Sequence, residues 1–92
     1  MGAFWNAVIP AYHKEFAGNA DADFMANKPS QARAVVGFRV NDVTSGTSVS
    51  MDDQGNNAVV YDNMVAGEEI AGRFTAINDT NTDADSIIVY YV

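Results

Sequence analysis

The chain between Arg33 and Tyr91 alternates apolar and polar residues in short runs, which clusters of Gly, Asn, Asp and Ser separate. A period of two places every second side chain on one face, which is typical of β-strands. The pattern predicts strands over Arg33–Val43, Thr47–Asp52, Ala58–Asp62, Glu69–Asn78 and Ser86–Tyr91. We therefore expect an all-β fold, a small antiparallel sandwich or barrel of about five or six strands.

The last predicted strand is apolar on both faces, because Ile87, Val89 and Tyr91 alternate with further apolar residues. Strands of this kind are buried on both sides. We expect the domain's own core to cover one side, and an N-terminal arm or a neighbouring subunit to cover the other. Ile88 and Tyr90 are therefore candidate interface residues.

Residues 1–28 differ from the rest and are interpreted as an N-terminal arm, followed by a β-domain over residues 29–92. The arm contains the single Trp and the single His, and Pro29 marks its end, since Pro does not fit inside a central strand. A short helix over Ala11–Ala17 would place two aromatics on one face. The proposed docking anchors are Phe4, Trp5, Tyr12 and Phe16, because large aromatics dominate interface energies. The alternative is that arm aromatics cap the domain's own core.

Three arginines, Arg33, Arg39 and Arg73, point away from the core in the predicted strands. They supply most of the positive charge of a chain with five Lys and Arg, twelve Asp and Glu, and a net charge of −7. Arginine suits interface ion pairs, so these residues are candidates for pairing with carboxylates of a neighbouring copy. The alternative is a set of exposed surface pairs that stabilise the fold little.

The acidic composition also limits the partners. A net charge of −7 repels nucleic-acid phosphates and anionic lipids, so neither nucleic acid nor a membrane is expected as a partner. The chain has 92 residues and no cysteine, so its core is small and disulfides cannot reinforce it. Such a domain would gain stability from self-association. The stretch Met1–Pro10 has neither the basic region nor the long apolar region of a signal peptide, so synthesis in a cytoplasm is expected.

Candidate chemistry is sparse. The run Asp79–Asp85 spaces oxygen-bearing side chains two apart, as the first half of a calcium loop does, but it lacks the Gly at the sixth position and the Glu at the twelfth. It is predicted to be a solvated loop, with no metal and no cofactor. His13 has no partner at a spacing that supports catalysis. No enzymatic activity is expected.

The predicted β-domain resembles small phage and gene-transfer-agent virion proteins of the spike-base or head-decoration type. The resemblance is carried, in order, by Arg33–Gly37, by Val49–Met51 before the turn at Gly55, by Asp62–Ile70, and by a Thr-rich loop that leads into Ile87–Tyr91. It implies a non-enzymatic virion component, made in the host cytoplasm and assembled as a trimer, pentamer or other ring. Its partners would be itself and other virion proteins, such as the major capsid protein.

A small carbohydrate- or protein-binding β module is the alternative function. Such a module would use Trp5, Tyr90 or Tyr91 as a stacking platform for a sugar ring. A sugar site needs exposed aromatics beside polar groups, whereas Tyr90 and Tyr91 lie in an apolar run. The structural role is therefore favoured.

Overall fold

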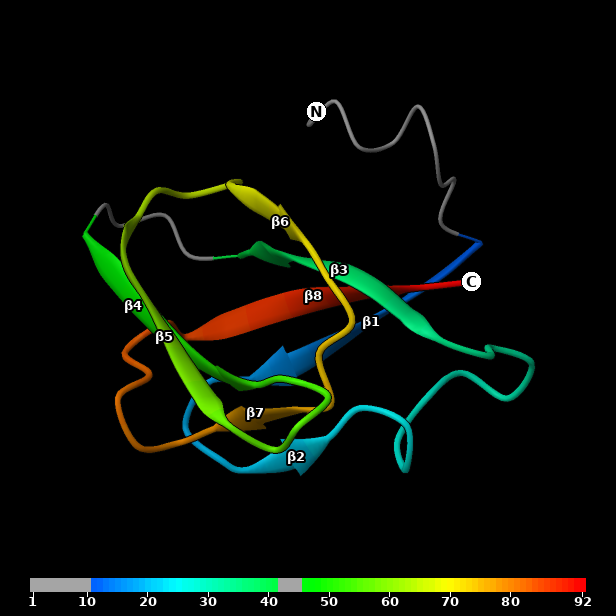
Figure 1. The fold of residues 1–92 in the computed structure, drawn as a ribbon. Coiled ribbons are helices and arrows are strands. Elements are labelled where there is room, and N and C mark those ends of the chain that lie inside the picture. Colours follow the sequence, from blue (N-terminus) through cyan, green and yellow to red (C-terminus); the bar gives the residue numbers. More distant parts are fainter. Residues whose placement is uncertain (1–10, 42–45) are drawn as a thin grey trace.

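A computed structural model describes residues 11–41 and 46–92 of the chain. The described residues form strands β1 (Tyr12–Ala17), β2 (Ala22–Asp23), β3 (Val35–Val40), β4 (Thr47–Asp52), β5 (Ala58–Met64), β6 (Glu69–Ala71), β7 (Ala76–Asn78) and β8 (Ser86–Tyr91). They pair as two four-stranded antiparallel sheets, in the orders β1-β8-β3-β6 and β2-β7-β4-β5 (Figure 1). The predicted all-β sandwich is confirmed. No helix in this part of the chain is long and apolar enough to cross a membrane.

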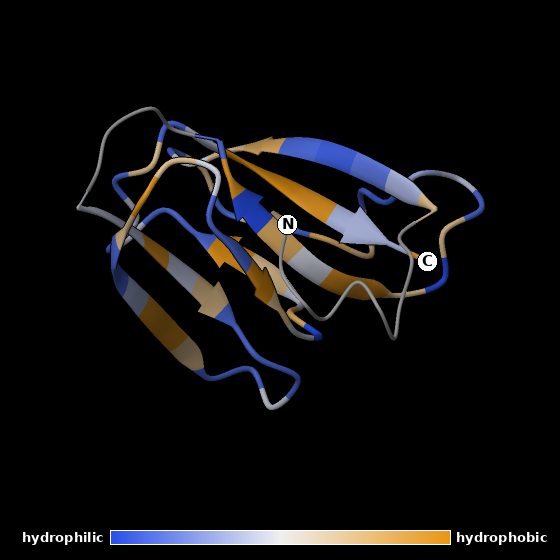
Figure 2. Cartoon of the chain, turned by 90° about the horizontal axis from the view of Figure 1, so that it is seen from above, coloured by the Kyte–Doolittle hydropathy of each residue, from blue (hydrophilic) through white to orange (hydrophobic). Residues whose placement is uncertain are grey.

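The core lies between the two sheets, which Figure 2 shows as separate layers seen from above. Both sheets contribute apolar side chains from the inward faces of their strands. In β4, Val49 and Met51 are fully buried, and in β8 the same holds for Ile87, Val89 and Tyr91. Alternation of this kind is what places one face of each strand against the other sheet.

Strand β8 occupies the centre of its sheet, between β1 and β3. Its bounds agree with the predicted strand Ser86–Tyr91. One face is buried completely, as expected, but the outer face is only partly covered by described residues, because Ile88 and Tyr90 are half-buried. The predicted burial on both sides therefore holds for the inner face alone.

The predicted strand Glu69–Asn78 is wrong as a single element. The chain forms two short strands there, β6 in one sheet and β7 in the other, and the residues between them cross from sheet to sheet. Gly72 donates its N–H to Val36 O at 3.0 Å in the first sheet, and Thr75 donates to Asp52 O at 2.9 Å in the second. A Cβ added to Gly72 would lie 2.6 Å from Cζ of Phe74, so the crossing requires glycine.

Residues 11–28 are built into the sandwich, which corrects their interpretation as an arm. Strand β1 pairs with β8 along its whole length, and β2 pairs with β7. The short helix considered over Ala11–Ala17 is wrong, since Tyr12–Ala17 is a strand. Phe16 and Phe24 are core residues, and their rings meet edge to face with centroids 5.0 Å apart.

Candidate docking pocket

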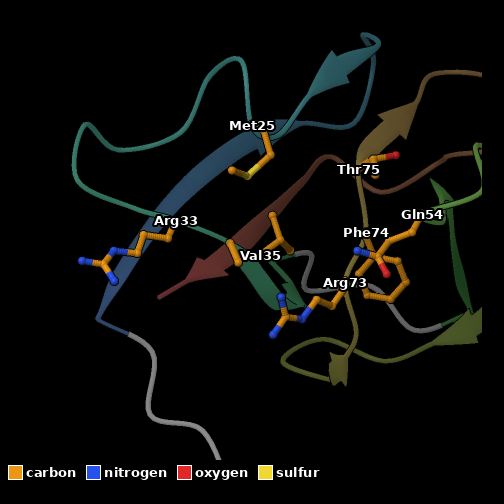
Figure 3. A pocket seen from close by; sticks show the side chains of 8 residues that line it. Met25, Arg33, Val35, Gln54, Arg73, Phe74 and Thr75 are labelled. Atoms are coloured by element: carbon orange, nitrogen blue, oxygen red, sulfur yellow. The ribbon is translucent and has the colours of Figure 1, made fainter.

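Two of the three arginines lie around one pocket at an end of the sandwich. The pocket has a volume of about 220 Å³. Figure 3 shows the side chains that line it, with Arg33 and Arg73 on either side of Val35. The docking pocket is lined by Met25, Arg33, Ala34, Val35, Gln54, Arg73, Phe74 and Thr75.

The segment before β3 holds one side of the docking pocket in place. Arg33 donates its backbone N–H to Val92 O at 2.6 Å, and Ala34 exchanges backbone hydrogen bonds with the same residue at 3.2 and 2.9 Å. These bonds extend the pairing of β3 with β8 beyond the assigned strands. Arg33 therefore projects from a backbone that is fixed to the central strand of the sheet.

The crossing between β6 and β7 holds the other side. Phe74 is 7% exposed, and its ring packs edge to face against Phe38 at 5.3 Å and against Tyr61 at 6.0 Å between centroids. The ring can lie there because Gly72 has no Cβ. Burial of Phe74 directs its neighbour Arg73 outward to solvent. The pocket thus joins a buried apolar floor to an exposed cationic rim.

The electrostatic state of the rim is unusual for so acidic a chain. Arg33 and Arg73 are both exposed, and neither guanidinium group makes a hydrogen bond or ion pair with another residue in the described ranges. The chain carries twelve carboxylates. The two unpaired guanidinium groups can each donate two hydrogen bonds to a carboxylate of another molecule. Val35 and Phe74 can at the same time contact an apolar group next to that carboxylate.

Arg39 lies elsewhere, on the outer face of the first sheet. Its Cα pairs in register with Ile88 on β8 and with Glu69 on β6. Tyr90 is next to them: burial raises the pKa of its hydroxyl, Glu69 raises it further, and a hydrogen bond and the charge of Arg39 oppose that rise. The structure therefore brings together three of the predicted interface residues, Arg39, Ile88 and Tyr90, on a half-buried polar and apolar surface.

Two of the proposed anchors from the N-terminal segment, Tyr12 and Phe16, lie within the described residues. Phe16 is 6% exposed and belongs to the core, so its prediction as a docking anchor is wrong. Tyr12 is half-buried against the core and lines a separate pocket together with Arg33 and Val92. Phe4 and Trp5 lie outside the described residues.

The Asp79–Asp85 loop uses its side chains to satisfy backbone groups of the second sheet. Asp83 accepts the N–H of Ser48 through Oδ1 at 2.5 Å, and the Thr82 hydroxyl accepts the N–H of Ser50 at 2.8 Å. The described residues contain no group of three or more His, Asp or Glu side chains arranged to hold a metal ion. The loop therefore lies along β4 as an irregular continuation of β7.

Sequence reasoning identified two of the eight residues that line the docking pocket, Arg33 and Arg73, and missed the other six: Met25, Ala34, Val35, Gln54, Phe74 and Thr75. The sequence does not distinguish Met25 from its buried neighbour Phe24, and its 39% exposure follows only from the fold. Comparison of the chain with protein-family models, with curated proteins and with solved structures finds no match in any of the three.

Proposed function

We propose that the chain is a structural subunit of a phage-like virion, a capsid decoration or spike-base protein without enzymatic activity. It self-associates and docks to the particle through the docking pocket. The partner group is a carboxylate next to an apolar side chain, on another virion protein such as the major capsid protein. Arg33 and Arg73 bind the carboxylate, and Val35 and Phe74 contact the apolar part.

One observation supports this proposal above the others. On a chain with net charge −7, two of the three arginines surround one apolar pocket and pair with no described residue of their own chain. Stability of the chain itself does not account for two exposed cations that pair with no described carboxylate. Binding of a partner's carboxylate does, since complementary charge gives an interface its specificity and speeds association. Phe4 and Trp5, which lie outside the described residues, stay predicted anchors in addition to the docking pocket.

The alternative function, a carbohydrate-binding module, finds less support. Tyr91 has 0% exposure and cannot stack on a sugar ring, and Tyr90 is half-buried beside Arg39. A polar pocket of about 270 Å³ does lie on the second sheet, but its lining contains no aromatic side chain. It is lined by Asp21, Ser50, Asp52, Asn56, Ala58, Asn78, Thr80 and Asn81.

The docking proposal is tested by reversing single charges. Arg33→Glu and Arg73→Glu should each weaken binding to particles assembled without this protein by roughly tenfold or more, because a carboxylate then faces a carboxylate. Arg39→Glu changes the net charge equally on a different surface and is the matched control. Cosedimentation with the particles measures binding, and circular dichroism checks that each variant is folded.

The pattern across the three variants decides the outcome. Loss of binding by Arg33→Glu and Arg73→Glu, with little change for Arg39→Glu, supports the docking pocket. An equal loss for all three would show an effect of net charge alone. Full binding by all three would place the docking surface elsewhere, and Phe4 and Trp5 would be the next residues to replace.

A further inference from the structure

Among the described strands, none pairs with the outer side of β5, which is one long side of the second sheet. Strand β5 is the outermost strand in the order β2-β7-β4-β5 (Figure 1) and spans Ala58–Met64. The edge strands β2 and β6 are only two and three residues long. The remaining edge strand, β1, carries Lys14 and Glu15. Short strands and charges are the usual means of blocking an edge, whereas β5 has seven residues and its single charged residue, Asp62, comes after the uncharged run Ala58–Tyr61.

The hydrogen-bonding groups of β5 that point outward can be identified from the hairpin. Asp53 donates its backbone N–H to Asn57 O, which makes these residues a hydrogen-bonded pair next to the turn. Bonded and non-bonded pairs alternate along an antiparallel ladder, so the pair Ser50 and Val60 is non-bonded. Consistently, Ser50 directs its N–H away from β5, to the Thr82 hydroxyl. Val60 and Ala58 therefore point their N–H and C=O groups to the open edge.

The side chains along this edge are apolar and incompletely covered. Tyr61 faces the core side of the sheet, where its ring meets Phe38 at 5.9 Å between centroids, and Val59 shares that face by alternation. Nevertheless Val59 is 36% exposed, because no strand in residues 11–41 and 46–92 lies beyond β5 to cover it. Val60, on the opposite face, is 41% exposed.

We propose that β5 pairs antiparallel with β5 of a second copy, about a two-fold axis at Val60, so that the two second sheets become one continuous sheet. This register places Val60 opposite Val60 and Val59 opposite Tyr61 of the other copy, a favourable pairing of β-branched and aromatic side chains. Asp62 falls opposite Ala58, so no two carboxylates face each other. The edge is thus complementary to itself, as a two-fold contact requires.

The extent of pairing is limited by the geometry of β5 itself. The register with β4 shifts after Tyr61, and Asn63 has a positive φ of 58°. A bulge of this kind bends the strand away from its plane and ends regular pairing. The contact is therefore confined to Ala58–Asp62, and one two-fold interface closes on two copies. This inference rests on the proposed self-association and names the surface that carries it.

Opposite charges introduced at the axis test the register. Val60→Lys and Val60→Asp each place like charges opposite one another in the pair of copies, so each variant alone should dimerise roughly tenfold more weakly than the unmodified chain. An equimolar mixture of the two should recover affinity to within about threefold, since Lys then faces Asp. Val65→Lys and Val65→Asp are the matched controls, because Val65 is 51% exposed and lies outside the strand. Sedimentation equilibrium measures the affinities.

Recovery in the Val60 mixture, with no change for the Val65 variants, supports the edge contact. A dimer unaffected by both Val60 variants, or a trimer or pentamer of the unmodified chain, overturns this inference but leaves self-association standing. A monomer of 9.9 kDa at every concentration overturns self-association as well, whereas docking through Arg33 and Arg73 is judged separately by cosedimentation.

Hydrogen exchange of the unmodified chain gives a second measurement that does not depend on whether the variants fold. The amide hydrogens of Ala58 and Val60 should exchange freely in dilute solution and become protected as the chain associates. Amides of β4 should be protected both in dilute solution and in the associated state, because β4 pairs with β5 on one side and with β7 on the other. Unprotected Ala58 and Val60 amides in the associated state would overturn the edge contact.

Discussion

Tyr91, at the end of β8, connects the last strand to the segment around Phe24 through a buried hydrogen bond. Its hydroxyl group donates a hydrogen bond to Phe24 O at 2.8 Å, and Tyr91 is 0% exposed. Burial, with a smaller contribution from the charge of Asp23, raises the pKa of Tyr91 to about 12. The neutral phenol is therefore the form that the folded state requires.

This raised pKa predicts a loss of stability at alkaline pH. In the unfolded chain Tyr91 ionises near its ordinary value of about 10, so between pH 10 and 12 the unfolded state releases a proton that the folded state keeps. The free energy of unfolding contributed by this group is complete below pH 10 and lost progressively up to pH 12. Urea unfolding midpoints measured from pH 8 to 12 check this expectation.

Two variants separate Tyr91 from the other ionising groups. Tyr91→Phe should be less stable at pH 8 by about 1–3 kcal/mol, because Phe24 O then lacks its donor, but should lose less stability above pH 10. Tyr12→Phe changes a tyrosine that is only half-buried and should follow the unmodified chain. A Tyr91→Phe curve parallel to that of the unmodified chain would contradict the assignment.

At the scale of elements, β1 explains why the N-terminal segment was misinterpreted. Tyr12, Lys14 and Phe16 alternate along one face of the strand, and a lysine at the middle position hides the period of two. Lys14 fits because its amine reaches out to donate to Asn27 O at 2.7 Å and lies 5.6 Å from the centre of the Phe16 ring. The same spacing of Tyr12 and Phe16 also fits a helix, and sequence alone offered no means to choose.

The placement of β1 and β2 in the sandwich predicts the effect of truncation. Deleting residues 1–26 removes both strands with the core side chains Phe16 and Phe24, so the remaining fragment should not fold. Phe24→Ala alone should cost about 3–5 kcal/mol of stability, as for other buried aromatics. Val65→Ala, at an exposed site, should stay within about 0.5 kcal/mol of the unmodified chain. Circular dichroism and urea unfolding report both; cooperative unfolding of a 27–92 fragment would restore the arm interpretation.

Other elements were predictable to different degrees for physical reasons. The bounds of β4 and β8 were predicted correctly, because β4 alternates apolar and polar residues up to the turn at Gly55 and β8 is a continuous apolar run after a polar loop. The division of Glu69–Asn78 was not, since β6 and β7 differ only in which sheet they join, and that depends on tertiary packing of Phe74. Likewise the outward orientation of Arg33, Arg39 and Arg73 followed from alternation and is confirmed, whereas their division between two surfaces did not.

For the whole molecule, the net charge of −7 acts on the two proposed interactions in opposite ways. Two copies repel one another at long range, and salt screens that repulsion. Docking by Arg33 and Arg73 is an attraction between opposite charges, which salt weakens. Raising sodium chloride from about 20 to 500 mM shortens the Debye length several-fold and should strengthen self-association while weakening attachment to the particle.

Sedimentation equilibrium and cosedimentation with particles, performed at the same salt concentrations, measure the two effects. Arg33→Glu provides the control, because it should remove most of the salt dependence of docking and leave that of self-association nearly unchanged. A parallel response of both interactions to salt would show that a single surface serves both, contrary to the separate positions of β5 and the docking pocket.

The central position of β8 also bears on how fast the molecule folds. β8 pairs with β1, whose register partners lie far away along the chain, such as Tyr12 with Tyr91. Such non-local pairing makes loop closure costly and places folding in the range of roughly milliseconds to seconds. The β4–β5 hairpin is local by contrast, and Asp53 accepts backbone N–H groups from Gly55 and Asn57 in its turn. The hairpin can therefore form first, and its open β5 edge is exposed to other chains before the rest of the sandwich is complete.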